Sequence, residues 1–316
     1  MKEFVDGLRK KFSEELGRTS GEYLKTGLDM FHNCREKESE YGQAAVGNMT
    51  VALELMLKSY IAVKSLSSIF RDLPPEMRVF LSNPESVPRF FKWRNYDIDI
   101  RSDKYKTLDL NECFDVFYML FPHMKQTLMP HIALLTRWRH PSLHGIMPDL
   151  NRYEFERIGY AVLSIAEALR GDKSYDFPWY SLSEYDTEFM RIFDTQRMER
   201  VEHALKQASS MAKEITGDSL RTVVAHNWDT FVTVCPVCRA SGLLKGYTEL
   251  AVGEDEDGPY PNLDFFATTF RCEECELILY DSEELHLANM NTLYDRSNEI
   301  EKWFMEHRNN MDWYMG

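Results

Sequence analysis

Two Cys-x-x-Cys pairs constrain what the C-terminal part of this chain can fold into. Cys235 and Cys238 form the first pair, Cys272 and Cys275 form the second, and 33 residues separate them. Each such turn can place two thiolates on one cation, and two turns complete the tetrahedral four-sulfur shell that structural zinc prefers. A redox-active dithiol is the alternative, but it normally begins a helix in a βαβ unit, whereas both pairs here lie in strand-like sequence. We therefore predict one structural Zn²⁺ with no open position for an activated water.

The spacing of apolar residues changes near residue 216. Before that point apolar residues recur at helical spacing, and after it short alternating runs indicate strands separated by turns. The sequence thus predicts an α+β fold with an all-α bundle, a small β-rich domain that resembles a zinc ribbon, and a final helix. A β-hairpin should fill the gap between the cysteine pairs. The expected parts are an accessory N-terminal helix over 1–20, ending near Gly17, a bundle over 21–172, a connecting helix over 173–215, a zinc ribbon over 216–290 and a C-terminal helix over 291–316.

One helix of the predicted bundle, expected over 43–70, is apolar almost all round, which makes it the central helix. Glu54 and Lys58 lie one turn apart on it, so each can neutralise the other. This pair could support a nearby site, although structural neutralisation is the commoner role of a buried ion pair. Cys34 and Cys113 have no partner at ligand spacing and are predicted to be small core residues.

Composition excludes several classes of protein. The chain has 316 residues, of which 44% are hydrophobic, enough for two globular domains. Its first residues show no apolar signal region, and no stretch approaches the ~20 apolar residues of a membrane span. A cytoplasmic protein that does not bind membranes is therefore expected. The formal net charge of −14 opposes binding of nucleic acid over the whole surface, so any nucleic acid must meet a local basic site.

One locally basic segment lies within a predicted insertion over 88–108. It contains six arginines and lysines between residues 89 and 106, with aromatic residues between them. Single-stranded RNA binding uses this mixture for backbone attraction and base stacking. The alternative is a loop that anchors its aromatic rings in the core and extends its cations into water. If the segment binds RNA, the predicted contacts are Arg89, Lys92, Trp93 and Arg94.

Residues 137–144 bring two arginines and two histidines together at a predicted helix end. Arginine can hold a phosphate through two hydrogen bonds, and histidine can exchange protons near neutral pH. The helix expected over 124–139 should stop before Pro141. A structural alternative is that Arg139 and His144 cap this helix, because its dipole favours cations at the C-terminus. The other seven of the nine histidines are predicted to be ordinary hydrogen-bonded residues.

The segment of roughly residues 20–172 resembles the HEPN domain family. The resemblance rests on the spacing Arg139-x4-His144, the Glu54-x3-Lys58 helix and a closing helix over 151–170. The resemblance implies a metal-independent ribonuclease in which two protomers join their motifs at a dimer interface. It implies that Arg139 clamps the scissile phosphate, that His144 is the general acid/base and that His140 is a polar helper. Arg137 also lies at a permitted spacing and is an alternative clamp.

Three functions remain open at this point. The first is an endoribonuclease that uses the 2′-hydroxyl of RNA as nucleophile. It would serve as a toxin or an anti-phage (antiviral) defence effector, and its partners would be RNA, a second copy of the chain and a regulatory protein. The second is a non-catalytic HEPN protein that binds nucleotide, RNA or a toxin partner. The third is an adaptor in which the zinc ribbon is the working part.

Overall fold

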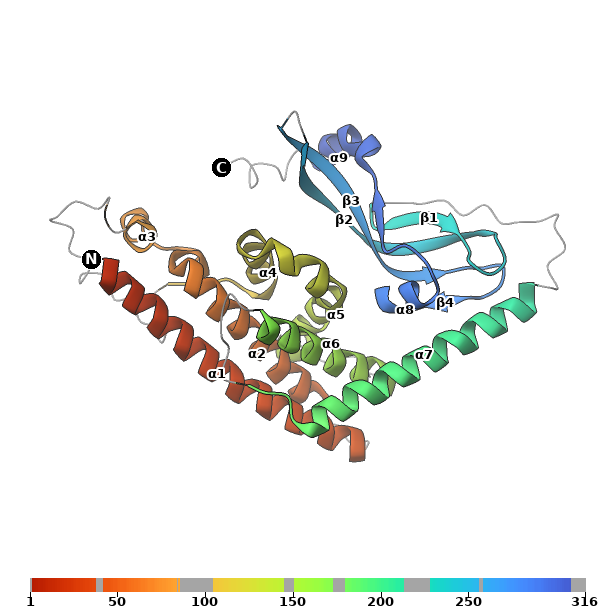
Figure 1. The fold of residues 1–316 in the computed structure, drawn as a ribbon, viewed down its shortest axis with the longest axis horizontal. Helices are drawn as coiled ribbons and strands as arrows, with labels where there is room; N and C mark the ends of the chain where they lie inside the picture. Colours follow the sequence, from red (N-terminus) through yellow and green to blue (C-terminus); the bar gives the residue numbers. More distant parts are fainter. Residues whose placement is uncertain are drawn as a thin grey trace. The chain divides into compact units, whose positions relative to one another are not determined.

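The computed structural model describes residues 2–37, 42–83, 105–144, 151–172, 180–212, 228–255 and 258–307, together with Glu85. The chain divides into two compact units, Met1–Phe193 and Asp194–Gly316. Among the described residues the regular elements of the first unit are all helices, whereas the second unit contains an antiparallel sheet (Figure 1). This mixture of helix and sheet confirms the α+β prediction.

The first unit is a set of packed α-helices. Its central helix is α2, which is buried along most of its length and contacts α1, α4, α5 and α6. The helices are α1 (Lys2–Lys37), α2 (Gly42–Lys64), α3 (Pro75–Ser82), α4 (Leu110–Leu120), α5 (Lys125–His144), α6 (Arg152–Gly171) and the start of α7 (Glu184–Ala212), with 3-10 turns at Leu66–Ile69 and Pro122–Met124.

Within the described ranges, α2 is the one helix long and apolar enough to cross a membrane by length and composition. Of its most apolar window, 72% is buried inside the structure. Such burial is typical of the central helix of a bundle.

Helix α1 differs from the prediction, which placed a helix end near Gly17 and an accessory helix over 1–20. The helix is continuous through that glycine. A glycine inside a helix costs about 1 kcal/mol relative to alanine, and packing offsets this cost. Apolar side chains from both halves of α1 enter one core: Val5, Phe12, Leu16, Leu24 and Phe31. Residues 2–20 are therefore part of the bundle.

The boundary between α5 and α6 is partly as predicted. Helix α5 continues to His144, so the expectation that it stops before Pro141 is wrong. The Ser142 hydroxyl donates to the Arg139 carbonyl at 2.8 Å in this last turn, where the proline has no N–H to give. Helix α6 begins at Arg152, close to the predicted start at residue 151, because the Asn151 side-chain oxygen caps it by accepting from the Glu154 N–H at 2.9 Å.

The second unit is built on a five-stranded antiparallel sheet with the order β1-β2-β3-β4 and with β5 also paired to β3. The long hairpin of β2 and β3 fills the gap between the cysteine pairs, as the sequence predicts. At a bulge in β2 only glycine fits, since a Cβ on Gly246 would lie 1.9 Å from the Phe266 carbonyl oxygen. The elements are β1 (Thr230–Val234), β2 (Ser241–Asp255), β3 (Gly258–Arg271), β4 (Ile278–Leu279), α8 (Ser282–Leu287), β5 (Leu293–Asp295), a 3-10 turn (Ser297–Glu299) and α9 (Ile300–His307).

The C-terminal prediction of one helix from residue 291 is wrong. Residues Leu293–Asp295 form β5, which pairs with β3, and α9 begins only at Ile300. Tyr294 lies opposite Phe265 in this pairing, with ring centroids 6.4 Å apart, and such cross-strand aromatic contacts stabilise strand pairing. Tertiary packing has therefore overridden the helical pattern of this segment.

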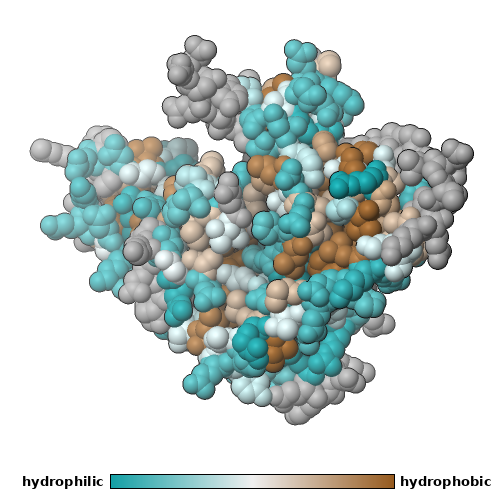
Figure 2. Space-filling model, turned by 45° about the vertical axis from the view of Figure 1, so that its right-hand side comes forward, coloured by the Kyte–Doolittle hydropathy of each residue, from teal (hydrophilic) through white to brown (hydrophobic). Residues whose placement is uncertain are grey.

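Each unit has its own hydrophobic core. One cluster of buried side chains extends from Val5 to Phe193, and a second extends from Val201 to Met290. Hydrophilic residues predominate on the face drawn in Figure 2, with hydrophobic residues between them. Because the cores are separate, damage to one unit can leave the packing of the other intact.

Candidate functional site

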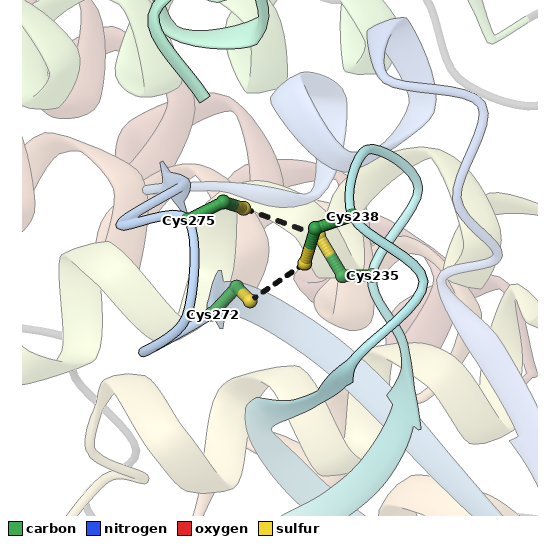
Figure 3. Close-up of side chains that lie close together, drawn as sticks. All are labelled: Cys235, Cys238, Cys272 and Cys275. Atoms are coloured by element: carbon green, nitrogen blue, oxygen red, sulfur yellow. Dashed lines mark hydrogen bonds between the residues drawn. The ribbon is translucent and has the colours of Figure 1, made fainter. Parts of the chain in front are cut away.

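The four cysteines of the two pairs come together in the second unit. Their sulfur atoms lie within 4.8 Å of one another, and they point toward a common centre from two turns (Figure 3). The Cys235 and Cys275 sulfurs are 3.6 Å apart, and those of Cys238 and Cys272 are 3.5 Å apart. Sulfurs around a tetrahedral zinc are about 3.8 Å apart, given Zn–S bonds of about 2.3 Å. The cluster therefore has a size that can hold a metal ion.

The two cysteine turns share one backbone geometry. In each, the residue after the second cysteine is left-handed, with φ of 66° at Arg239 and 57° at Glu276. In each, the N–H of the first cysteine donates to the carbonyl five residues later, at 2.7 Å from Cys235 and 2.9 Å from Cys272. A left-handed conformation at a non-glycine residue is costly and persists where its surroundings require it. Both turns are thus shaped to aim two sulfurs at one point.

The protonation of these thiols also depends on their surroundings. Desolvation raises the pKa of the Cys235 thiol to about 11 and raises that of Cys275 further. At Cys238 desolvation is outweighed by the Ala240 N–H and the neighbouring sulfurs, which lower the pKa. Metal binding requires thiolates, so a bound ion would displace protons from Cys235 and Cys275.

The motif arginine lies beside the acidic residue of the central helix. Arg139 on α5 donates from Nε to Glu54 on α2 at 3.1 Å, and its Nη2 also bonds the same carboxylate oxygen. The other Glu54 oxygen accepts from Lys58 Nζ at 2.7 Å, and Lys58 in turn donates to Thr107 at 3.0 Å. All three charged side chains are mostly buried. One carboxylate is therefore shared by two cations.

Several predicted site residues have side chains outside the described part of the structure. Helix α5 carries Arg137, His140 and His144, but their side chains are not described. The predicted RNA contacts Arg89, Lys92, Trp93 and Arg94 also lie outside the described residues. Trp138, between the two arginines, is buried in the core.

A third polar cluster, which was not predicted from the sequence, lies where α1 meets the start of α7. His32 Nε2 bonds Asp186 at 2.9 Å, and the other Asp186 oxygen accepts from Tyr180 and Ser183. The available signal was Ser183-x-x-Asp186, a capping box, and both of its backbone bonds are formed. The pairing with His32, 154 residues away, had no signal in the sequence.

The charge of Asp186 makes this cluster dependent on pH. Although burial disfavours the charged form, hydrogen bonds from His32, Ser183 and Tyr180 outweigh it and lower the pKa of Asp186 to about 2. A carboxylate whose pKa is lowered by folding stabilises the fold at pH values above its pKa in the unfolded chain. This stabilisation is lost as the pH falls through the pKa of the carboxylate in the folded protein. Burial raises the pKa of Tyr180, and the Asp186 carboxylate acts in the same direction.

We expect Asp186→Asn to lower the free energy of unfolding of the helical unit by about 2 kcal/mol at neutral pH. The deficit should shrink as pH falls from about 4 toward 2, because the wild-type carboxylate then becomes protonated as well. Urea unfolding followed by far-UV circular dichroism measures it, with the exposed Glu14→Gln on α1 as the control. A deficit that does not change with pH would contradict the assigned role of the carboxylate.

Comparison with models of known protein families, with curated proteins and with solved structures found no match.

Proposed function

We propose that this protein is a metal-independent endoribonuclease of the HEPN type, with its active site in the helical unit. The observation that carries the proposal is the contact of Arg139 with Glu54. It joins the two parts of the sequence on which the resemblance rests, the Arg139-x4-His144 segment and the Glu54-x3-Lys58 helix.

The side-chain hydrogen bonds of Arg139 speak against the structural alternative, in which Arg139 caps its own helix. Those it makes within the described residues go to Glu54. Its Nη1 makes no hydrogen bond in that part of the chain and can still donate to a phosphate oxygen. Arg139, Lys58 and Glu54 together carry one net positive charge, which suits a phosphate better than a fully neutralised pair.

In the proposed reaction RNA supplies its own nucleophile, so the protein needs to move protons and stabilise charge on phosphorus. His144 takes the proton of the 2′-hydroxyl or gives one to the leaving 5′-oxygen. Arg139 holds the scissile phosphate, Arg137 is the alternative clamp, and His140 assists next to the arginine. Since one His144 serves each chain, two protomers are needed to supply both proton transfers, and we propose a homodimer.

The chemistry of the RNA ends tests this reaction directly. Attack by the 2′-hydroxyl should leave a 2′,3′-cyclic phosphate or a 3′-phosphate and a 5′-hydroxyl, in buffer with excess EDTA as well as without it. Mass spectrometry of the products of a short synthetic RNA identifies the ends. Products with 5′-phosphates would contradict the mechanism.

We further propose that the ion of the cysteine cluster is Zn²⁺, because four buried or partly buried thiolates at tetrahedral spacing match its preference. It would complete a zinc ribbon that is structural, since all four positions are taken by sulfur. We propose that the protein acts in the cytoplasm as a toxin or defence effector. An unregulated ribonuclease is dangerous to a cell, so we also propose that a regulatory protein controls it. A non-catalytic HEPN binding protein would instead bind RNA without cutting it.

The segment 89–106 should guide RNA to the site, because it is locally basic in an acidic chain. Replacing Arg89, Lys92 and Arg94 with alanine should weaken RNA binding and reduce its salt dependence, by about 0.7 in the logarithmic slope per lost phosphate contact. Trp93→Ala should cost a further ~1–3 kcal/mol if the ring stacks on a base. Fluorescence anisotropy at several salt concentrations measures both effects. A fall in melting temperature at unchanged RNA affinity would assign the aromatic residues to the core.

A further inference from the structure

The buried lysine of the central helix has a second hydrogen-bond acceptor, which lies outside the residues on which the HEPN resemblance rests. Lys58 Nζ donates to Glu54 at 2.7 Å and to the Thr107 hydroxyl at 3.0 Å. The Lys58 side chain is 5% exposed. An ammonium group so far from water depends on protein acceptors, because a buried donor that loses its partner is costly. Thr107 therefore helps to fix where the Lys58 ammonium lies.

The backbone on both sides of Thr107 is held by hydrogen bonds. Thr107 lies in a short antiparallel bridge. The carbonyl of the preceding residue, Lys106, accepts from the Arg71 N–H at 2.9 Å. The N–H of the following residue, Leu108, donates to the Ile69 carbonyl at 3.0 Å. The Thr107 hydroxyl thus extends from a backbone whose position is already set.

The Glu54 carboxylate passes the position of Lys58 on to Arg139. One Glu54 oxygen accepts from Lys58, and the other accepts from Arg139 Nε at 3.1 Å. A carboxylate is planar, so a cation that fixes one oxygen also fixes the direction in which the other oxygen points. A displaced Lys58 would let this plane turn and would misalign the guanidinium. Misalignment of a group that binds the reacting atoms lowers the rate of the chemical step.

The segment that carries Thr107 borders the Arg139 site at a second point. Asp109, two residues further on, lies close enough to Arg139 for the arginine charge to act on it. Desolvation disfavours the charged form of Asp109, but hydrogen bonds from the Glu112 N–H and Arg71 and the charge of Arg139 outweigh it and lower its pKa. The same segment directly follows residues 89–106, for which we propose a role in guiding RNA. It therefore connects that region with the arginine.

We propose that Thr107 is a positioning residue of the ribonuclease site: by holding Lys58 in place, its hydroxyl orients Arg139 through the carboxylate that the two cations share. This inference rests on the proposed function. Thr107 does not touch RNA and acts only through the arginine. Its loss should therefore slow the reaction of bound RNA and leave the affinity for RNA nearly unchanged. The competing explanation is that the hydroxyl only satisfies a buried ammonium and stabilises the fold.

Thr107→Val tests the proposal in the full-length chain, because it removes the hydroxyl and keeps the size of the side chain. We expect the single-turnover cleavage rate at saturating RNA to fall by about 10-fold or more, as for loss of a hydrogen bond to a charged group, with an RNA dissociation constant within about 2-fold of the wild type. Thr107→Ser restores the hydroxyl and should recover most of the lost rate. Thr19→Val is the matched control: Thr19 is a half-buried threonine of α1 whose hydroxyl donates to the Glu15 carbonyl at 2.9 Å.

Nuclear magnetic resonance of protein with isotope-labelled arginine supplies a readout that does not need RNA. The Arg139 Nε–H signal, assigned by its absence from Arg139→Lys protein, should shift and exchange faster with water in Thr107→Val than in the wild type. An unchanged signal, an unchanged cleavage rate, or a loss of rate that Thr107→Ser does not recover would each overturn the proposal. If the wild type cleaves no RNA but the Arg139 signal responds to Thr107→Val, the positioning contact stands and the ribonuclease function fails.

Discussion

His144→Ala should lower the rate of RNA cleavage by about 10²–10⁴, the usual loss when a general acid/base is removed. Arg139→Ala should cause a loss of similar size, because it removes the proposed stabilisation of charge on the phosphate. Single-turnover cleavage of a labelled RNA by purified full-length protein measures both rates. His123→Ala is the matched control, since its imidazole is largely exposed, pairs with Asp172 and lies outside the motif.

Two results would count against the proposed active site. Cleavage by His144→Ala at the wild-type rate would remove the histidine from the mechanism, and RNA binding without cleavage by the wild type would favour the non-catalytic alternative. The proposed mechanism also needs two protomers, each of which supplies one His144. Sedimentation at the assay concentration should therefore find a dimer. A fully active monomer would show that one chain suffices.

Cys272→Ser should abolish metal binding and unfold the second unit. Structural zinc sites contribute about 10–16 kcal/mol of apparent binding free energy at neutral pH, which exceeds the stability of a small domain. Cys272 is fully buried, so loss of the ion would leave the remaining thiols of the cluster inside the unit without a metal to bind them. Metal analysis and limited proteolysis of the β-rich unit report the two effects. The helical signal should persist, since the first unit has its own core.

Cys34→Ser is the matched control for this substitution. Cys34 is a buried cysteine of the helical core and lies outside the cluster, so this variant should keep its metal. Protein purified without chelators that contains no zinc, or Cys272→Ser protein with wild-type metal content and protease resistance, would contradict the proposed site.

Some features of the fold were predictable because they depend on neighbouring residues. The start of α6 next to Asn151 and the ion pair of Glu54 with Lys58 each depend on residues within one helical turn, and both formed as expected. The strand pairing that spaces the cysteine turns followed from alternating residues around a short turn. Predictions failed where packing overrode a local pattern, as at Gly17 inside α1 and at Leu293 in β5.

What the sequence by itself determined is the local chemistry: which residues could hold a metal and where an arginine and histidines gather. Only the tertiary structure decided which distant groups meet. Arg139 reaches Glu54 across 85 residues, and His32 reaches Asp186 across 154. The physical reason is that local spacing sets the direction of side chains along one helix or turn, whereas contacts between helices depend on the packing of the whole core. The cysteine cluster stands between these cases, because each turn is local but their meeting needs the β2–β3 hairpin.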